Sequence, residues 1–241
     1  MGSLNYFEYN GARSLDYGVI ISSPVVTDAP RRDAENITIP GRSGTLTLSN
    51  NRFDDISVRY ECWVHTPEWG REPETVRQIK GWLLSAGAGY HRLSDTYNPD
   101  YFRAARFNGP ISVAHDAPRV SSFDLEFLAY PFQFSLEGDE LREVLSGEAI
   151  YNPEAFEARP YIKLYGSGDI TLTINEKAWE LSGVDGYIEI DSMIQNTFKG
   201  LENLNKNKTG EGYPILQPGY NEIYASGNIE QILIKPRWCT L

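Results

Sequence analysis

The chain has 241 residues, of which 41% are hydrophobic and 12% aromatic, and its formal net charge is −11. This length allows two domains of ordinary size, and the apolar content excludes a disordered chain. No apolar run approaches the ~20 residues of a membrane-spanning helix, and an acidic chain is a poor ligand for nucleic-acid phosphates. The first residues show no basic region followed by an apolar one, so we expect no secretory signal and folding in a cytoplasm.

The first informative element is the stretch IPGRSGTL at residues 39–46. A phosphate-binding loop needs its glycines between a buried strand and a helix, but here the alternating sequence TLTLS follows. Pro40 and Gly41 suit the two central positions of a type II turn, because proline fixes φ and glycine accepts a positive φ. The stretch therefore predicts the tip of a β-hairpin that carries Arg42, and not a phosphate site.

Alternation of apolar and polar residues predicts half-buried strands on either side of one helix. Residues 56–64 and 123–129 alternate in this way. Between them, residues 72–86 carry apolar side chains at helical spacing, with Pro73 in the first turn. The first half of the chain is therefore predicted to be a β domain with a single helix.

The segment 136–160 is acidic and lacks a strand pattern, so we place a domain boundary within it. Beyond it, alternation returns in three stretches that are bounded by turn-forming residues: 169–175, 186–191 and 228–235. The predicted domains are residues 1–138 and 139–241, and the predicted fold class is mainly β.

Charge is distributed unevenly along the chain. Residues 1–136 hold 12 Arg and one Lys against 16 acids, a net charge of −3, whereas residues 137–241 hold three Arg and six Lys against 17 acids, a net charge of −8. Arg is favoured over Lys at protein interfaces. The contrast favours two domains with different neighbours; chance drift in Arg and Lys usage is the alternative interpretation.

The sequence contains no motif for catalysis, a metal or a cofactor. The histidines His65, His91 and His115 are not accompanied by a G-x-S-x-G motif, and neither H-E-x-x-H nor C-x-x-C occurs. Cys62 and Cys239 are too few for a disulfide framework or a zinc site, and we expect buried, reduced thiols. The only support for a hydrolase is the abundance of acidic residues, which supply carboxylate pairs by chance. We therefore expect no enzymatic activity, and the lack of motifs leads us to expect no metal and no cofactor.

Exposed aromatic rings on a β-sandwich can bind sugars by stacking. Three residues in the second half are candidates for this role: Trp179, Tyr187 and Tyr213. Ordinary packing within a sheet is the alternative interpretation of each. A sugar-binding role therefore depends on whether these rings are exposed.

Nine stretches of the sequence occur in a characteristic order and spacing that covers nearly the whole chain. They are LDYGVII (15–21), IPGRSGTL (39–46), IKGWLL (79–84), LSDTYNPDYFRAARF (93–107), FDLEFLAYPFQFS (123–135), ARPYIKLYGSGDITLTIN (158–175), YIEIDS (187–192), YPILQPGYNEIYASG (213–227) and IKPRW (234–238). Together they resemble the distal tail protein (Dit) family of long-tailed, non-contractile bacteriophages and related prophages.

The resemblance implies a two-domain β protein. Its N-terminal β-sandwich or split barrel, with one helix, would form a hexameric ring, and its C-terminal galectin-like β-sandwich would lie on the periphery. In the family, the ring is the structural hub of the tail tip, joins the tail tube to the tip or baseplate proteins and leaves a channel for DNA. The implied location is the tail tip of a virion that is assembled in the cytoplasm of a bacterial host.

The implied partners are further copies of the chain, the tail tube protein, and the tip, tail-associated, receptor-binding or baseplate proteins. The hairpin tip then supplies the candidate ring or tube contacts: Pro40, Gly41, Arg42, Ser43 and Gly44. Trp179 is the candidate for docking or sugar stacking in the C-terminal domain. A carbohydrate-binding module for host-surface adsorption is the alternative function.

Overall fold

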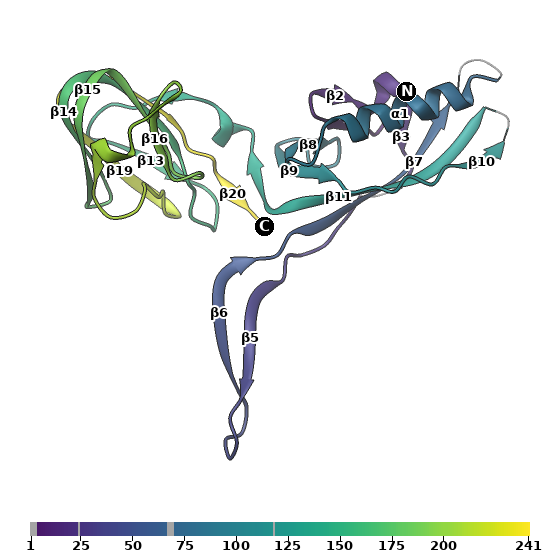
Figure 1. Cartoon of the computed structure of the whole chain (residues 1–241), viewed down its shortest axis with the longest axis horizontal. Coiled ribbons are helices and arrows are strands. Elements are labelled where there is room, and N and C mark those ends of the chain that lie inside the picture. Colours follow the sequence, from purple (N-terminus) through teal and green to yellow (C-terminus); the bar gives the residue numbers. More distant parts are fainter. Residues whose placement is uncertain (1–3, 24, 67–69, 118) are drawn as a thin grey trace. The chain divides into compact units, whose positions relative to one another are not determined.

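The computed structural model describes residues 4–23, 25–66, 70–117 and 119–241. The chain forms two compact units, one from Met1 to Gln133 together with Leu241 and the other from Phe134 to Thr240. Each unit has its own hydrophobic core. Both are built mainly from β-strands, as the sequence predicts (Figure 1). The folding of residues 1–138 and 139–241 as separate domains remains a proposal.

The first unit contains a sheet with the strand order β2-β1-β8-β9-β11-β7-β3, in which β4 also pairs with β7 and β10 with β11. Its longest pairing joins β7 and β11, which are antiparallel from Ile56 opposite Ala129 to His65 opposite Val120. The strands are β1 (Phe7–Tyr9), β2 (Ala12–Arg13), β3 (Val19–Ile21), β4 (Val26–Thr27), β7 (Ile56–His65), β8 (His91–Asp95), β9 (Tyr101–Phe107), β10 (Ala114–Ala117) and β11 (Val120–Ser135); a 3-10 turn, η1 (Ser14–Tyr17), follows β2.

The alternation along β7 and β11 places one row of side chains in the core. From Ile56 to Val64, every second residue of β7 is buried, and the residues between them are exposed or half-buried. In β11 the buried row includes Phe123, Leu125 and Phe127. The sequence prediction of half-buried strands is therefore confirmed for this pair, because successive side chains of a strand point to opposite faces.

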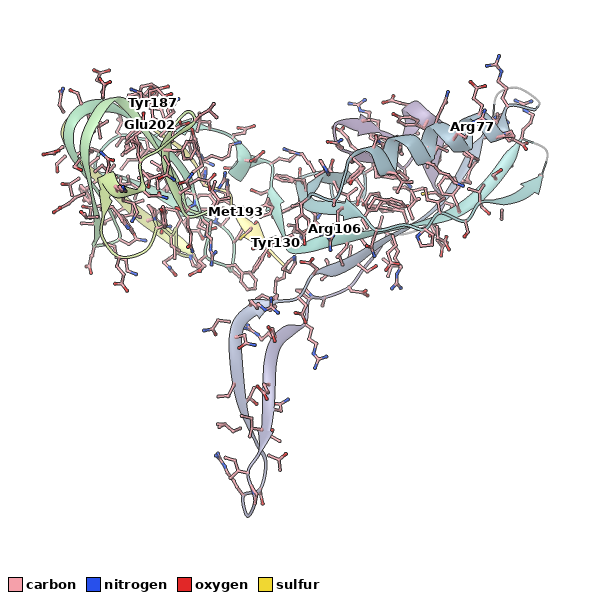
Figure 2. The ribbon with its side chains drawn as sticks, viewed as in Figure 1. Arg77, Arg106, Tyr130, Tyr187, Met193 and Glu202 are labelled. Carbon is pink, nitrogen blue, oxygen red and sulfur yellow. The ribbon has the colours of Figure 1, made fainter. Side chains whose placement is uncertain are left out.

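The helix predicted at about 72–86 is α1 (Glu72–Ser85), and its apolar side joins the core of the sheet. Trp82 stacks on Tyr17 with 4.4 Å between ring centroids, and its Nε1 donates a hydrogen bond to the carbonyl of Tyr9 over 3.3 Å. The opposite side of the helix is polar and exposes Arg77 (Figure 2). Periodic apolar residues thus account for both the helix and its packing.

The first unit also contains a separate two-stranded sheet, the hairpin of β5 (Arg32–Thr38) and β6 (Thr45–Phe53) (Figure 1). Aromatic and charged side chains contact one another at the base of the hairpin. Phe53 meets Phe132 edge to face with 5.6 Å between centroids, Arg32 lies 4.7 Å over the Phe53 ring, and Arg52 pairs with Asp33.

The second unit has a sheet with the order β12-β19-β14-β15-β16-β17, in which β13 also pairs with β19 and β18 with β15. Its long strands, β14 (Tyr161–Ile174), β15 (Lys177–Asp191) and β19 (Gly219–Lys235), pair antiparallel with register shifts that bend the sheet. The shorter elements are η2 (Glu137–Asp139), β12 (Arg142–Glu143), β13 (Glu148–Asn152), β16 (Asn196–Lys199), β17 (Glu202–Asn203), η3 (Asn205–Asn207), β18 (Lys208–Thr209) and β20 (Cys239–Thr240).

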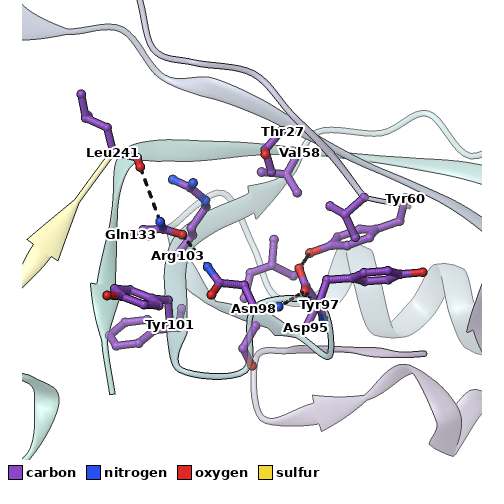
Figure 3. A pocket seen from close by; sticks show the side chains of 14 residues that line it. Thr27, Val58, Tyr60, Asp95, Tyr97, Asn98, Tyr101, Arg103, Gln133 and Leu241 are labelled. Carbon is purple, nitrogen blue, oxygen red and sulfur yellow. Dashed lines mark hydrogen bonds between the residues drawn. The ribbon is translucent and has the colours of Figure 1, made fainter. Parts of the chain in front are cut away.

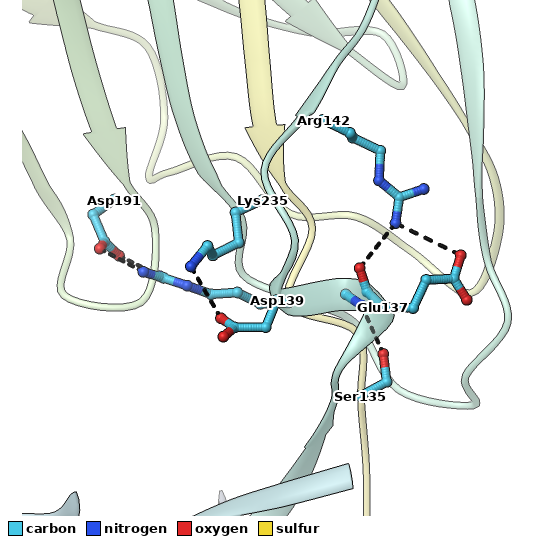
Figure 4. Close-up of polar contacts among 8 residues, drawn as sticks. Ser135, Glu137, Asp139, Arg142, Asp191 and Lys235 are labelled. Atoms are coloured by element: carbon cyan, nitrogen blue, oxygen red, sulfur yellow. Dashed lines mark hydrogen bonds and ion pairs between the residues drawn. The ribbon is translucent and has the colours of Figure 1, made fainter. Parts of the chain in front are cut away.

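The first and last segments of the second unit lie against each other. A Cβ on Gly138 would lie 2.4 Å from the backbone nitrogen of Trp238, so the close approach requires glycine. Lys235 Nζ lies 3.2 Å from Asp139 Oδ1, and Arg142 Nη2 donates to the Glu137 carbonyl over 3.3 Å (Figure 4). These contacts hold η2 and β12 against the end of β19.

Candidate assembly surface

The β5–β6 hairpin presents an apolar row to solvent. Its register places Ile37 opposite Leu46 and Glu35 opposite Leu48, so these side chains share one face of the ribbon. The four large apolar side chains are 37% to 48% exposed: Ile37, Ile39, Leu46 and Leu48. A two-stranded ribbon has no core of its own, and this row therefore stays in water in the single chain.

The other face of the hairpin is polar. It carries Asn36, Thr38, Thr45, Thr47 and Ser49, all of them exposed. Thr47 Oγ1 donates a hydrogen bond to Asn36 Oδ1 over 2.7 Å. The hairpin is thus amphipathic although both faces are exposed, and this pattern is typical of a strand pair that is covered on one face by another molecule.

The tip of the hairpin is a type II turn, as the sequence predicts. Gly41 has φ +80°, and the Arg42 N–H donates to the Ile39 carbonyl over 3.2 Å. Gly44 also has a positive φ, of +83°. All five candidate contact residues, 40–44, are exposed. Among the described residues, the Arg42 side chain has no ion pair, so the tip presents a free guanidinium to solvent.

A second feature of the first unit is a cavity of about 280 Å³ near the β8–β9 turn (Figure 3). Tyr60 donates a hydrogen bond to Asp95 Oδ2 over 2.8 Å, and Asp95 Oδ1 accepts the N–H groups of Tyr97 and Asn98 over 2.9 and 3.1 Å. Burial raises the pKa of Tyr60, and the neighbouring Asp95 raises it further. Because these polar groups are already paired with one another, their evident role is to hold the turn.

The histidines and cysteines are the residues on which catalysis or metal binding would depend. His65 is exposed at the end of β7, His91 lies in β8, and the side chain of His115 lies outside the described residues. Cys62 and Cys239 are buried, free thiols, as predicted, and burial raises the pKa of each to about 12. Among the described residues there is no group of three or more His, Cys, Asp or Glu side chains that could hold a metal. No helix in the described part of the chain is long and apolar enough to cross a membrane.

Trp179 belongs to the core of the second unit. Its side chain is 2% exposed, and its Nε1 donates to the carbonyls of Glu211 and Gly212, each over 3.2 Å. Stacking on a sugar or docking a partner requires an exposed ring, so the structure corrects this prediction to a role in packing. In β15, Trp179 and Leu181 are two residues apart and both buried, and this alternation is the sequence signal by which the packing role could have been found.

The other two aromatic candidates are half-buried. The Tyr187 ring lies beside Tyr165, with Lys163 Nζ 4.1 Å from its centroid. Tyr213 donates a hydrogen bond to Asn205 Oδ1 over 3.0 Å, and Lys208 lies 4.5 Å over its ring. The most exposed aromatic pair in this unit, Tyr151 and Tyr220, was not among the sequence candidates. Those two rings are 55% and 76% exposed and 5.0 Å apart.

No model of a known protein family matches the chain, and no curated protein matches it. Solved structures of phage tail proteins do share its fold. The Dit protein of phage SPP1, described as a paradigm of the hub of the adsorption apparatus in phages that infect Gram-positive bacteria, matches with a TM-score of 0.69 at 13% identity and covers 96% of this chain and 98% of that one.

Two structures of the activated phage P2 baseplate also match over nearly the whole chain. The structure with Ca has a TM-score of 0.52 at 9% identity and covers 97% of each chain. The structure with Sr has a TM-score of 0.55 at 10% identity and covers 96% of this chain and 97% of that one. The chain therefore has the two-domain β fold of a Dit-like phage tail protein.

Proposed function

We propose that this chain is the structural hub of a phage tail tip. Six copies close a ring through residues 1–138, the ring joins the tail tube to the tip or baseplate proteins, and its centre leaves a channel for DNA. The protein acts in the virion after assembly in the host cytoplasm, and it has no enzymatic activity. Residues 139–241 form a galectin-like domain on the periphery.

The observation that carries this proposal is the amphipathic β5–β6 hairpin. Its apolar row, Ile37, Ile39, Leu46 and Leu48, is exposed in the single chain. Burying apolar surface stabilises an association by roughly 25 cal/mol per Å², so a neighbouring copy that covers this row would gain stability. The fold shared with the SPP1 hub protein supports the same conclusion.

The hairpin tip is assigned to the contact with the neighbouring copy or with the tail tube. Residues 40–44 are all exposed, and Arg42 is the cation at the end of the ribbon. Arginine is enriched at interfaces because its planar guanidinium can donate two parallel hydrogen bonds to one carboxylate. The Arg-rich composition of residues 1–136 is consistent with this role.

The test is the mass of the whole chain in solution, followed by negative-stain imaging. We expect rings of six copies for the unaltered protein. The double variant Ile37→Lys with Leu46→Lys places two charges at one cross-strand pair of the apolar face, and it should yield monomers with an unchanged melting temperature, because both side chains are exposed.

The matched control uses the adjacent cross-strand pair on the polar face, Thr38→Lys with Thr45→Lys. It adds the same charge to the same ribbon and should still form rings. The proposal is contradicted if the unaltered chain is monomeric at every concentration. Equal loss of rings in both double variants would show that the apolar face is not the interface.

A further inference from the structure

Strand β13 (Glu148–Asn152) lies at an edge of the second unit. In residues 134–240, all of which the structure describes, β13 pairs with β19 alone. An edge strand carries a row of N–H and C=O groups that can pair with another chain. The other side of β13 is therefore available for an added strand.

The register shows which backbone groups point to this free edge. Glu222 of β19 turns its backbone towards β14, since its carbonyl accepts the Asn175 N–H over 3.2 Å and its own N–H donates to Asn175 Oδ1 over 3.1 Å. Its partner across the ladder, Ala149, is therefore in a non-hydrogen-bonded pair. The N–H and C=O of Ala149 thus point away from β19, as do those of Tyr151 two residues later.

A hollow of about 380 Å³ lies beside this edge and is lined by residues of η2, β12 and β13 together with Val144 and Pro153. Three glutamates reach it, and within residues 134–240 only Glu137 has a cationic partner, Arg142, whose Nη2 lies 3.8 Å away. Glu148 accepts the Leu145 N–H over 2.9 Å, and within residues 134–240 neither Glu143 nor Glu148 has a cation beside it. The hollow is therefore negative.

Exposed apolar side chains border the same edge. Tyr151 is 55% exposed and Leu145 70% exposed, and Tyr220 lies opposite Tyr151 on β19 with 76% of its surface in solvent. A strand that paired with β13 would place alternate side chains over the Tyr151 ring. The edge thus combines free backbone groups, an aromatic surface and uncompensated negative charge.

We propose that β13 receives an extended, basic segment of a partner protein, which adds a strand by backbone pairing and directs a Lys or Arg side chain to Glu143. Strand addition is a general mode of peptide recognition, in which main-chain hydrogen bonds supply affinity and alternate side chains supply specificity. That the partner is a neighbouring tail protein rests on the proposed hub function. The docking surface and its chemistry rest on β13 and the glutamates beside it.

The test uses the whole chain and a short fluorescent peptide in which lysine alternates with valine and threonine. We expect saturable anisotropy at millimolar concentration or below, together with slower hydrogen exchange in residues 148–152. The same peptide with glutamate at each lysine should not bind. Ala149→Pro removes the outward N–H, a position where an edge strand tolerates proline, and should abolish binding without loss of the fold.

Two further variants keep the test decisive. Glu143→Lys is an exposed change and should weaken binding about tenfold, whereas Ala149→Ser keeps the backbone donor and should bind normally. The proposal is overturned if the peptide still binds to Ala149→Pro, or if the peptide does not slow hydrogen exchange in residues 148–152. It is also overturned if a second copy of the chain, in place of the peptide, protects these residues. Ring mass is measured on the same samples. If rings form but the peptide does not bind, only the strand addition at β13 is contradicted. If the peptide binds but no rings form, only the proposed hub function is contradicted.

Discussion

Arg237 and Asp191 form a two-pronged ion pair inside the second unit: Nη1 and Nη2 donate to Oδ1 and Oδ2 over 2.6 and 2.8 Å. The two side chains are 20% and 12% exposed. Asp191 Oδ1 also accepts the Met193 N–H over 3.0 Å, and the Arg237 N–H donates to the Gly138 carbonyl over 2.6 Å. The pair therefore ties the turn after β15 to the final segment of the chain.

Replacing Asp191 with Asn should destabilise the second unit by about 2 kcal/mol, because it leaves a largely buried guanidinium without its counter-charge. Denaturant unfolding followed by tryptophan fluorescence, to which the buried Trp179 and Trp238 of the second unit contribute, measures the change.

The matched control is Asp185→Asn. Asp185 pairs with Lys199 over 3.3 Å, but its side chain is 97% exposed, and exposed pairs contribute little. We expect no measurable loss of stability. Equal effects of the two substitutions would show that the burial of the Arg237 pair has no energetic consequence.

The same pair predicts a dependence of stability on pH. Burial would by itself raise the pKa of Asp191, but the hydrogen bonds and charge of Arg237 outweigh it and hold the pKa below its ordinary value of 3.8. A carboxyl with a lowered folded pKa stabilises the fold above its unfolded pKa, and this contribution is lost as the pH falls through the folded pKa. The stability difference between the unaltered protein and Asp191→Asn should stay constant from neutral pH to about 5 and shrink below about 4. A difference that grows with acid would contradict the assignment.

Gly41→Val should impair assembly of the proposed ring more than it lowers the stability of the chain. Gly41 has φ +80°, and a Cβ there would meet nothing within 4 Å, so the cost is conformational and of the order of 1–3 kcal/mol. That cost falls on the hairpin tip, where the turn sets the position of Arg42. Ring yield by negative-stain imaging is the measurement.

Gly81→Ala is the control for this substitution. Gly81 lies in α1 on the exposed side, and a Cβ added there would meet nothing within 4 Å beyond the backbone of its own helix. Alanine in a helix is favoured over glycine by about 1 kcal/mol, so we expect a small gain in stability and normal rings. Normal ring yield for Gly41→Val would refute the importance of the turn.

The second unit should not bind galactosides. Residues 137–241 contain no histidine, so the His-Asn-Arg set by which galectins hold sugar is absent, and Trp179 is buried. Polar groups placed to meet a sugar confer specificity because leaving them unpaired is costly, and a bare tyrosine offers only weak stacking. Calorimetric titration of the whole chain with lactose should show no saturable heat at millimolar concentration. A saturable titration would revive the carbohydrate-binding alternative.

Much of this fold follows from neighbouring residues along the chain. The alternation in residues 56–64 and 123–129 predicts β7 and β11 together with their buried faces, because a strand turns successive side chains to opposite sides. The apolar spacing at 72–86 predicts α1, and Pro40 with Gly41 predicts the turn at the hairpin tip. Each of these depends on backbone preferences that act over a few residues, and each is confirmed.

Only the tertiary structure decided which apolar rows are covered. The alternation in residues 45–49 resembles that in residues 56–64, yet the β5–β6 ribbon leaves Leu46 and Leu48 in water because no other element among the described residues covers that face. Trp179 is buried for the opposite reason, since the carbonyls of residues 211 and 212 close over its indole nitrogen. Arg237 meets Asp191 across 46 positions of sequence. Burial and ion pairing depend on contacts between segments distant in the chain, and local periodicity does not specify which segments meet.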